Sequence, residues 1–209
     1  MFAMKYPRTP HLPWSAGGTA DDVRLCDLAA FSGKRLIILE KLDGENTVMT
    51  HETIHARSED GYGKPWQTSM KRMWSCIRND IPEWMHLCGE CTYAVHSIEY
   101  ARLDSIFHVF GIFTDDGRCL SWKDVVEWSE LLGFNTVPVI TAGSIDDIHE
   151  LPIPTESIFG GICEGYVIRN IEGFPAADFA SNVAKCVRKD HVTTDEHWTK
   201  NWKKQVMFA

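Results

Sequence analysis

The chain has 209 residues and a mass of 23.8 kDa, with 44% hydrophobic and 24% charged residues. This ordinary globular composition excludes a disordered tail, a collagen-like repeat and a coiled coil. The net charge of −8 excludes a uniformly basic coat for nucleic acid, but it permits a local basic groove because net charge says nothing about distribution. The length is about 1.4 times a typical domain. Because no linker is evident, we expect a single domain over residues 1–209.

The sequence carries no signal for a membrane or for export. No segment reaches the roughly 18 apolar residues that a membrane helix needs. The N-terminus lacks the apolar core of a secretory signal. The seven cysteines are odd in number and scattered, which favours reduced thiols. We therefore expect a cytoplasmic protein that makes no membrane contact.

Residues 1–33 predict an irregular arm followed by a short helix. Three prolines and two glycines within the first twenty residues oppose regular structure. Asp21 and Asp22 are suited to cap a helix that ends at Phe31.

Apolar, β-branched runs predict most of the remaining elements as short strands. The expected strands lie at residues 34–40, 46–50, 53–57, 87–93, 107–113, 136–140, 164–169 and 183–188. Helices are expected from Pro65 to Ile77, and from a capping box at Ser121 to Gly133. A last, basic helix is expected within 189–209. Together these elements favour an α+β fold of mostly antiparallel sheets flanked by helices.

Charge is unevenly placed along the chain. Residues 141–164 include five acidic and no basic side chains, whereas residues 185–209 include six basic and three acidic ones. The basic C-terminal segment is suited to hold phosphates, although a solvated helix face explains the lysines equally simply.

The most informative stretch runs from Glu40 through Lys41, Asp43 and Gly44 to Asn46. Lys41 follows a buried strand at the mouth of a turn. A lysine becomes a covalent nucleophile when neighbouring cations or burial lower its pKa, and a nearby glycine lets backbone approach a ligand. Read alone, this short pattern also fits a surface lysine before a hairpin.

Further motifs follow in a fixed order along the chain. They are Ala56-Arg57-Ser58, Gly89-Glu90, the aromatic strand 107–113, Glu164-Gly165-Tyr166-Val167-Ile168-Arg169 and Ala184-Lys185-Cys186-Val187-Arg188. This collinear set resembles the covalent nucleotidyltransferase superfamily of ATP-dependent RNA ligases, DNA ligases and mRNA capping enzymes. The likeness is greatest to the RNA ligase branch typified by bacteriophage T4 RNA ligase 2. Both ends of the chain also look like those of small stand-alone RNA-ligase-like proteins of phages and bacteria.

The resemblance implies a nucleotidyltransferase (adenylation) domain and a role for each matched residue. Lys41 would attack the α-phosphorus of ATP, expel pyrophosphate and carry AMP. The remaining nucleotide-binding residues would be Glu40, Asn46 (phosphate or 5′ end), Arg57 (ribose or phosphate), Glu90 (ribose hydroxyls), Phe107 (adenine stacking), Glu164, Lys185 (α-phosphate) and Arg188. Lys41, Lys185 and Glu164 form the expected catalytic set.

Phosphoryl-type chemistry independently fits these residue types. It needs cations on the phosphate oxygens and a metal ion for the leaving pyrophosphate. Glu164 and Glu90 would hold Mg²⁺ or Mn²⁺ mostly through water. The bound metal and the neighbouring basic side chains are expected to lower the pKa of Lys41.

Two features leave alternatives open. The related family usually has a second lysine where this chain has Val187, so either the register slips or Arg188 takes part of that role. Separately, His86, Cys88 and Cys91, with His96 following, could form a zinc site.

The leading hypothesis is an ATP-dependent RNA ligase that joins a 3′-OH to a 5′-phosphate through lysyl-AMP and an adenylated 5′ end. A DNA ligase or capping enzyme is the alternative, although about twenty residues after Arg188 are too few for the OB-fold that those enzymes append. A nucleic-acid-binding module without sealing activity is a third hypothesis, and an adenylyltransferase acting on other molecules is a remoter one. RNA or RNA-containing ends are the expected partner. An end-healing kinase or phosphatase and a second copy of the chain are further candidates.

Overall fold

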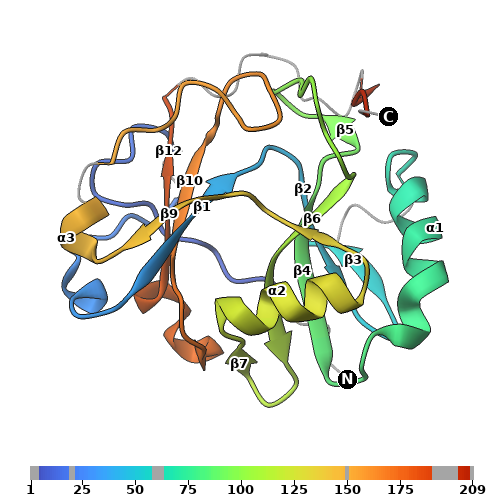
Figure 1. Ribbon diagram of the computed structural model, residues 1–209, viewed down its shortest axis with the longest axis horizontal. Helices are drawn as coiled ribbons and strands as arrows, with labels where there is room; N and C mark the ends of the chain where they lie inside the picture. Colours follow the sequence, from blue (N-terminus) through green and yellow to red (C-terminus); the bar gives the residue numbers. More distant parts are fainter. Residues whose placement is uncertain (1–4, 19–21, 58–63, 149–150, 190–201, 208–209) are drawn as a thin grey trace.

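The computed structural model describes residues 5–18, 22–57, 64–148, 151–189 and 202–207. Within them, the strands form two main sheets and a small third one, and nearly all pairings are antiparallel (Figure 1). The α+β class expected from the sequence is confirmed. None of the helices in these residues has both the length and the apolar character that crossing a membrane requires.

The first sheet is built around the apolar run that precedes Lys41. Its strand order is β12-β10-β1-β9. The strands are β1 (Leu36–Lys41), β9 (Val139–Gly143), β10 (Gly165–Asn170) and β12 (Val183–Val187). Side chains on alternate positions of β1 enter two different cores: Leu36 and Ile38 pack in one, and Ile37 and Leu39 in the other. Burial on both faces explains why this strand is apolar at every position from 36 to 39.

The second sheet has the order β11-β7-β6-β4-β2-β3, with β8 added beside β6. Its strands are β2 (Glu45–Met49), β3 (Ile54–Ala56), β4 (Met85–Cys91), β6 (Phe107–Thr114), β7 (Arg118–Cys119), β8 (Asn135–Thr136) and β11 (Phe174–Pro175). The third sheet pairs β5 (Ala94–Val95) with β13 (Lys203–Lys204).

Two helices cover the second sheet near its edges (Figure 1). They are α1 (Gln67–Ile77) and α2 (Trp122–Leu131); a short α3 (Ile145–Ile148) lies beside the first sheet. Short 3-10 turns occupy Ala29–Phe31, Arg78–Asp80 and Ala176–Ser181. The capping box is confirmed, because the Ser121 hydroxyl accepts a hydrogen bond from the Asp124 amide at 3.2 Å.

The expected N-terminal helix is wrong for the described residues. Only Ala29–Phe31 forms a 3-10 turn. The chain before it is held by tertiary hydrogen bonds instead, since Arg24 donates to the carbonyls of Leu12, Ser15 and Gly17 at 2.6–3.3 Å. A side chain that ties distant carbonyls together stabilises an irregular loop in place of helical turns.

The expected C-terminal helix is likewise wrong where the structure describes it. Lys203–Lys204 is a strand, Trp202 packs on Trp66, and the buried Gln205 side chain bonds to the backbone of Ile98 and Tyr100. The sequence predicts a helix here because Trp198, Trp202 and Val206 stand four residues apart. The contacts of residues 202–205 determine a different conformation, and Trp198 lies outside the described residues.

The arm extends the first sheet beyond β12. The Leu12 amide donates to the Lys185 carbonyl at 2.8 Å, and the Lys185 amide donates to the Pro10 carbonyl at 2.9 Å. The Gly17 amide donates to the Val187 carbonyl at 2.7 Å. The edge of β12 is therefore paired along its length, which protects it from pairing with another chain.

Candidate active site

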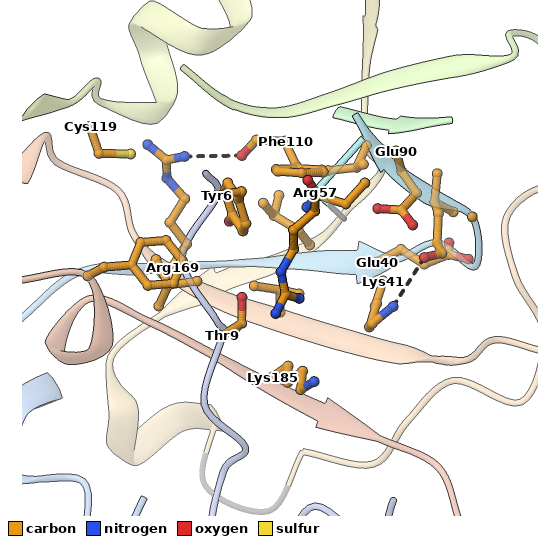
Figure 2. Close-up of a pocket in the computed structure, with 18 residues that line it drawn as sticks. Tyr6, Thr9, Glu40, Lys41, Arg57, Glu90, Phe110, Cys119, Arg169 and Lys185 are labelled. Atoms are coloured by element: carbon orange, nitrogen blue, oxygen red, sulfur yellow. Dashed lines mark hydrogen bonds between the residues drawn. The ribbon is translucent and has the colours of Figure 1, made fainter. Parts of the chain in front are cut away.

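A cavity of about 270 Å³ lies where the two main sheets face each other. Strands β1, β10 and β12 contribute one wall, strands β2, β4 and β6 contribute the other, and the arm closes one side. Its polar and aromatic lining residues include Tyr6, Thr9, Glu40, Lys41, Asn46, Arg57, Glu90, Phe110, Arg169 and Lys185 (Figure 2). Five other residues expected from the sequence therefore line the cavity together with Lys41: Glu40, Asn46, Arg57, Glu90 and Lys185.

Lys41 is the last residue of β1, and its position follows from strand pairing. It lies opposite Gly165 in the antiparallel register with β10. Its Nζ donates to Glu164 Oε2 at 2.8 Å. It also donates to the Leu42 carbonyl at 3.3 Å (Figure 2). Lys41 keeps 25% of its side chain exposed, whereas Glu164 keeps 4%. The amine can thus meet a ligand while its carboxylate partner stays buried.

The turn after Lys41 is fixed by Asp43 and Gly44. One carboxylate oxygen of Asp43 accepts hydrogen bonds from the amides of Ser97 and Ile98 at 2.7 and 2.8 Å. A Cβ atom at position 44 would overlap the Cys91 carbonyl, so the motif needs glycine for close backbone packing. The turn residues of the motif therefore position Lys41.

The electrostatics of the cavity favour a protonated Lys41. Burial alone would lower its pKa, but the carboxylates of Glu164, Glu90 and Asp43 outweigh burial and raise it. Burial, helped by the carboxylates of Glu164 and Asp43, raises the pKa of Glu90 to about 8 despite the opposing effect of Lys41. The sequence predicts a lowered pKa for Lys41 in the presence of a bound metal ion. Without a metal ion, the neighbouring carboxylates of the protein raise the pKa of Lys41 instead.

The ring expected to stack on adenine is placed elsewhere. Phe107 is fully buried in the core, 5.3 Å from the ring of Phe134, and does not line the cavity. Phe110, three residues later, lines it instead, with Tyr6 in edge contact at 4.9 Å. Cys88 pairs with Gly111 and Gly89 with Val109, so Phe110 is the extra residue of a β-bulge. Bulges redirect side chains in this way.

Arg188 also lies away from the cavity. Its guanidinium donates to the carbonyls of Cys163 and Pro154 at 3.2 and 3.0 Å. It therefore does not take the place of the second lysine. Val187, which stands at that position, is buried. It packs closely on Gly17 of the arm, where an added Cβ atom would lie 3.1 Å from the Val187 side chain.

Asn46 and Arg57 stand between this cavity and a second one. Asn46 pairs with Glu90 across β2 and β4, and its buried Oδ1 has no hydrogen-bond partner among the described residues. Asn46, Arg57 and Tyr6 line both cavities. The second cavity, of about 580 Å³, is lined in addition by Lys5, Pro7, Arg8, Glu45 and Ala56.

The sequence interpretation missed Tyr6, Thr9, Phe110 and Arg169. Arg169 is 3% exposed and donates to the Phe110 carbonyl at 3.1 Å. It stands at the end of the motif that begins with Glu164, so its position was available as a signal. Tyr6 and Thr9 belong to an irregular arm, where no periodicity marks an inward side chain.

The zinc hypothesis gains no support. Within the described residues, no group of three or more His, Cys, Asp or Glu side chains is arranged to hold a metal ion. His86 instead contacts Asp115 at 2.7 Å. Glu90 and Glu164 provide two carboxylates near Lys41, a set suited to a largely hydrated Mg²⁺ or Mn²⁺.

Two facing antiparallel sheets with a lysine nucleophile candidate at their cleft define a nucleotidyltransferase-type domain. A family model described as RNA ligase matches residues 34–187. The chain therefore belongs to the RNA ligase family.

Solved structures share this fold. A variant of the Naegleria gruberi RNA ligase with ATP and Mn matches with a TM-score of 0.53 and 14% identity, covering 79% of this chain and 52% of that chain. Form 1 of an archaeal ATP-dependent RNA ligase matches with a TM-score of 0.51 and 15% identity, covering 80% and 46%. The chain thus spans about half the length of the solved structures it matches. A comparison with curated proteins finds no match.

The two phenylalanines of β6 predict different consequences of truncation. Phe107→Ala should lower the free energy of unfolding by about 3–5 kcal/mol, because it leaves a cavity in a closed core. Phe110→Ala should destabilise less and weaken nucleotide binding instead. Urea denaturation, with ATP titration of each folded variant, distinguishes them; equal ATP affinity in Phe110→Ala and the parent would contradict the assignment.

Proposed function

We propose that this chain is an ATP-dependent RNA ligase that joins a 3′-OH to a 5′-phosphate through a lysyl-AMP intermediate. The observation that carries the proposal is the partly exposed Lys41 amine, held at 2.8 Å by Glu164 in a cavity with Lys185 and Arg57. The family match and the shared fold of ATP-dependent RNA ligases support it.

In the first step, Lys41 Nζ attacks the α-phosphorus of ATP. A nitrogen–phosphorus bond forms, the bond to the bridging oxygen of the β-phosphate breaks, and pyrophosphate leaves with the electron pair. Before the attack the Lys41 ammonium gives up one proton to Glu164, the carboxylate that already accepts its hydrogen bond, which frees the lone pair on Nζ. The second proton, lost as the nitrogen–phosphorus bond forms, leaves to the pyrophosphate or to water. Lys185 and Arg57 balance charge on the phosphate oxygens. AMP is then transferred to the 5′-phosphate, and the 3′-OH displaces it.

A divalent metal ion fits the cavity through Glu90 and Glu164. When bound, it neutralises the leaving pyrophosphate and offsets the carboxylates that otherwise keep Lys41 protonated. The pKa of Glu90 is raised first by burial and then by the carboxylates of Glu164 and Asp43. A buried carboxyl group with other carboxylates nearby is stabilised in its ionised form by a cation, which agrees with this assignment.

The base end of the cavity suits a purine with an exocyclic amine. Glu40 is 5% exposed, and its Oε2 accepts from the Ile158 amide at 3.2 Å. Its Oε1 is buried without a hydrogen-bond partner among the described residues. The 6-amino group of adenine would satisfy that oxygen, whereas the 6-carbonyl that guanine carries at the same position would not. Phe110 supplies the ring face.

The polynucleotide enters, on this proposal, through the second cavity. Lys5, Arg8 and Arg57 give its described lining positive charge, which suits contacts to phosphates. The one acidic side chain, Glu45, is turned toward α1, where it accepts from Trp66 and Gln67 at 3.1–3.3 Å. Contacts to phosphates alone give binding that is independent of sequence.

The finer assignments extend the same proposal. The order Lys41, Asp43, Gly44, Asn46 supports the T4 RNA ligase 2 type. All seven cysteines are free, which supports a reducing, cytoplasmic location. An end-healing kinase or phosphatase would supply the 5′-phosphate and 3′-OH ends that the reaction consumes.

Covalent labelling tests the central step. Protein incubated with Mg²⁺ and α-labelled ATP should retain label on a denaturing gel, and Lys41→Ala should abolish it, because no other residue replaces the attacking amine. Lys64→Ala, an exposed lysine outside the first cavity, is the matched control and should label normally. Absence of label in the parent, when mass spectrometry shows no preformed adenylate, would refute the ligase function and favour a binding module.

Nucleotide choice tests the Glu40 contact. The parent should label with ATP at least tenfold faster than with GTP, and Glu40→Ala should reduce this preference by removing an acceptor for the adenine amine. Rates of labelling with each nucleotide measure the preference. An unchanged ATP-to-GTP ratio in a folded Glu40→Ala protein would assign base recognition elsewhere.

Substitutions in the arm test the second cavity. The double change Lys5→Ala and Arg8→Ala should leave labelling of Lys41 intact but slow AMP transfer to a 5′-phosphorylated RNA by about tenfold, because phosphate contacts govern strand binding. Transfer is measured by isolating labelled protein and adding RNA at several salt concentrations. Parent-like transfer at every salt concentration would contradict this entry path; Lys123→Ala on α2 is the control.

A further inference from the structure

Lys185 is held by an acidic partner from outside the matched family region. Asp22 lies in the arm, and its Oδ1 is 3.5 Å from Lys185 Nζ. The lysine side chain is 19% exposed and that of Asp22 is 34% exposed. Residue 22 precedes the span 34–187 that the RNA ligase model matches, so this contact is a property of the arm.

The other oxygen of Asp22 faces a buried histidine. Asp22 Oδ2 is 3.5 Å from Nε2 of His11, which is 2% exposed. On the opposite side of the ring, His11 Nδ1 is 2.8 Å from the Ser15 hydroxyl. Ser15 Oγ accepts a hydrogen bond from the Val187 amide at 3.0 Å, and the Val187 carbonyl, at 3.5 Å, is a second acceptor for the Ser15 proton besides His11 Nδ1.

These bonds define the histidine tautomer. If Ser15 donates to Nδ1, the ring proton resides on Nε2, the atom that faces Asp22. Burial, reinforced by Lys185, lowers the pKa of His11 to about 4, so the ring is neutral near pH 7. A series of contacts thus runs from Val187 through Ser15, His11 and Asp22 to Lys185, and both of its ends lie on β12. Because His11 is neutral, the charge of Asp22 is balanced by Lys185.

We propose that Asp22 is a positioning residue that holds the Lys185 ammonium at the wall of the nucleotide cavity, with His11 packed beside the carboxylate. This inference rests on the proposed adenylation at Lys41. Lys185 is the lysine that the last motif directs to the cavity. Val187 occupies the position of the family's second lysine, and Arg188 donates to backbone carbonyls. The position of Lys185 therefore matters more for binding phosphate.

The electrostatic surroundings of Lys185 support the proposal. Burial lowers its pKa, and the Lys41 ammonium lowers it further. Asp22 from the arm acts in the opposite direction, as does Glu164 beside β10, while His11 is neutral. Glu164 already pairs with Lys41. Removing the charge of Asp22 therefore leaves Lys185 less able to hold a proton.

The test measures Lys185 directly and then its effect on a ligand. The protein is produced with lysine labelled with ¹³C at Cε, and the Lys185 signal is assigned as the one that disappears in Lys185→Arg. An NMR pH titration should then give a lower pKa for Lys185 in Asp22→Asn than in the parent. The variant should also bind the α,β-methylene analogue of ATP about threefold to tenfold more weakly, the range expected for a partly exposed ion pair. Asp22→Glu should restore most of the affinity, and Asp146→Asn on exposed α3 is the charge-matched control.

A double-mutant cycle separates positioning from a purely structural role. In a Lys185→Ala background, Asp22→Asn should have no further effect on affinity for the analogue. An unchanged Lys185 pKa, or the same loss of affinity in both backgrounds, would overturn the proposal, and thermal unfolding confirms that each variant is folded. The NMR titration needs no catalysis, so a failure of ATP labelling in the parent refutes the ligase function separately.

Discussion

The register of β1 against β10 determines whether this molecule has an active site. Side chains alternate between the two faces of a strand, so a slip by one residue would turn Lys41 out of the cleft. The same slip would exchange the side chains that Leu36 and Leu39 direct into two different cores. Burial on both faces of β1 thus penalises a slip strongly. One constraint thus specifies both the hydrophobic core and the position of Lys41, the proposed nucleophile.

That register brings charges together at a cost. Lys41, Glu90 and Glu164 share a poorly hydrated cleft, and burying ionised groups is unfavourable unless they are paired. The Lys41–Glu164 pair satisfies both partners, but Glu90 remains strained, as its raised pKa shows. A site of this kind is suited to a cation, which would offset the carboxylates that surround Lys41. The same buried charges therefore lower the stability of the fold and favour the binding of a ligand.

The sequence predicted the strands and the charged residues of the cleft because both leave local patterns. Apolar runs mark β1 and β6, and short motifs mark Lys41, Glu90, Glu164 and Lys185. Phe110 escaped because its inward direction depends on a β-bulge, which an alternating pattern does not reveal. The arm and the C-terminal segment escaped for a related reason: their conformations are set by tertiary hydrogen bonds, as with Arg24 and Gln205, and not by periodicity.

The arm and the C-terminal segment, whose conformations were not predicted correctly from the sequence, both contact elements that form the cleft. Gln205 bonds to the backbone of Ile98 and Tyr100; the Ile98 amide, in turn, donates to Asp43 next to the nucleophile. The arm pairs with β12 and presents Asp22 to Lys185. The region matched by the family carries the reacting groups, whereas these flanking segments hold the loops and strands from which those groups project. On the proposal made for Asp22, the arm thereby reinforces Lys185, the lysine that the last motif retains, from outside that motif.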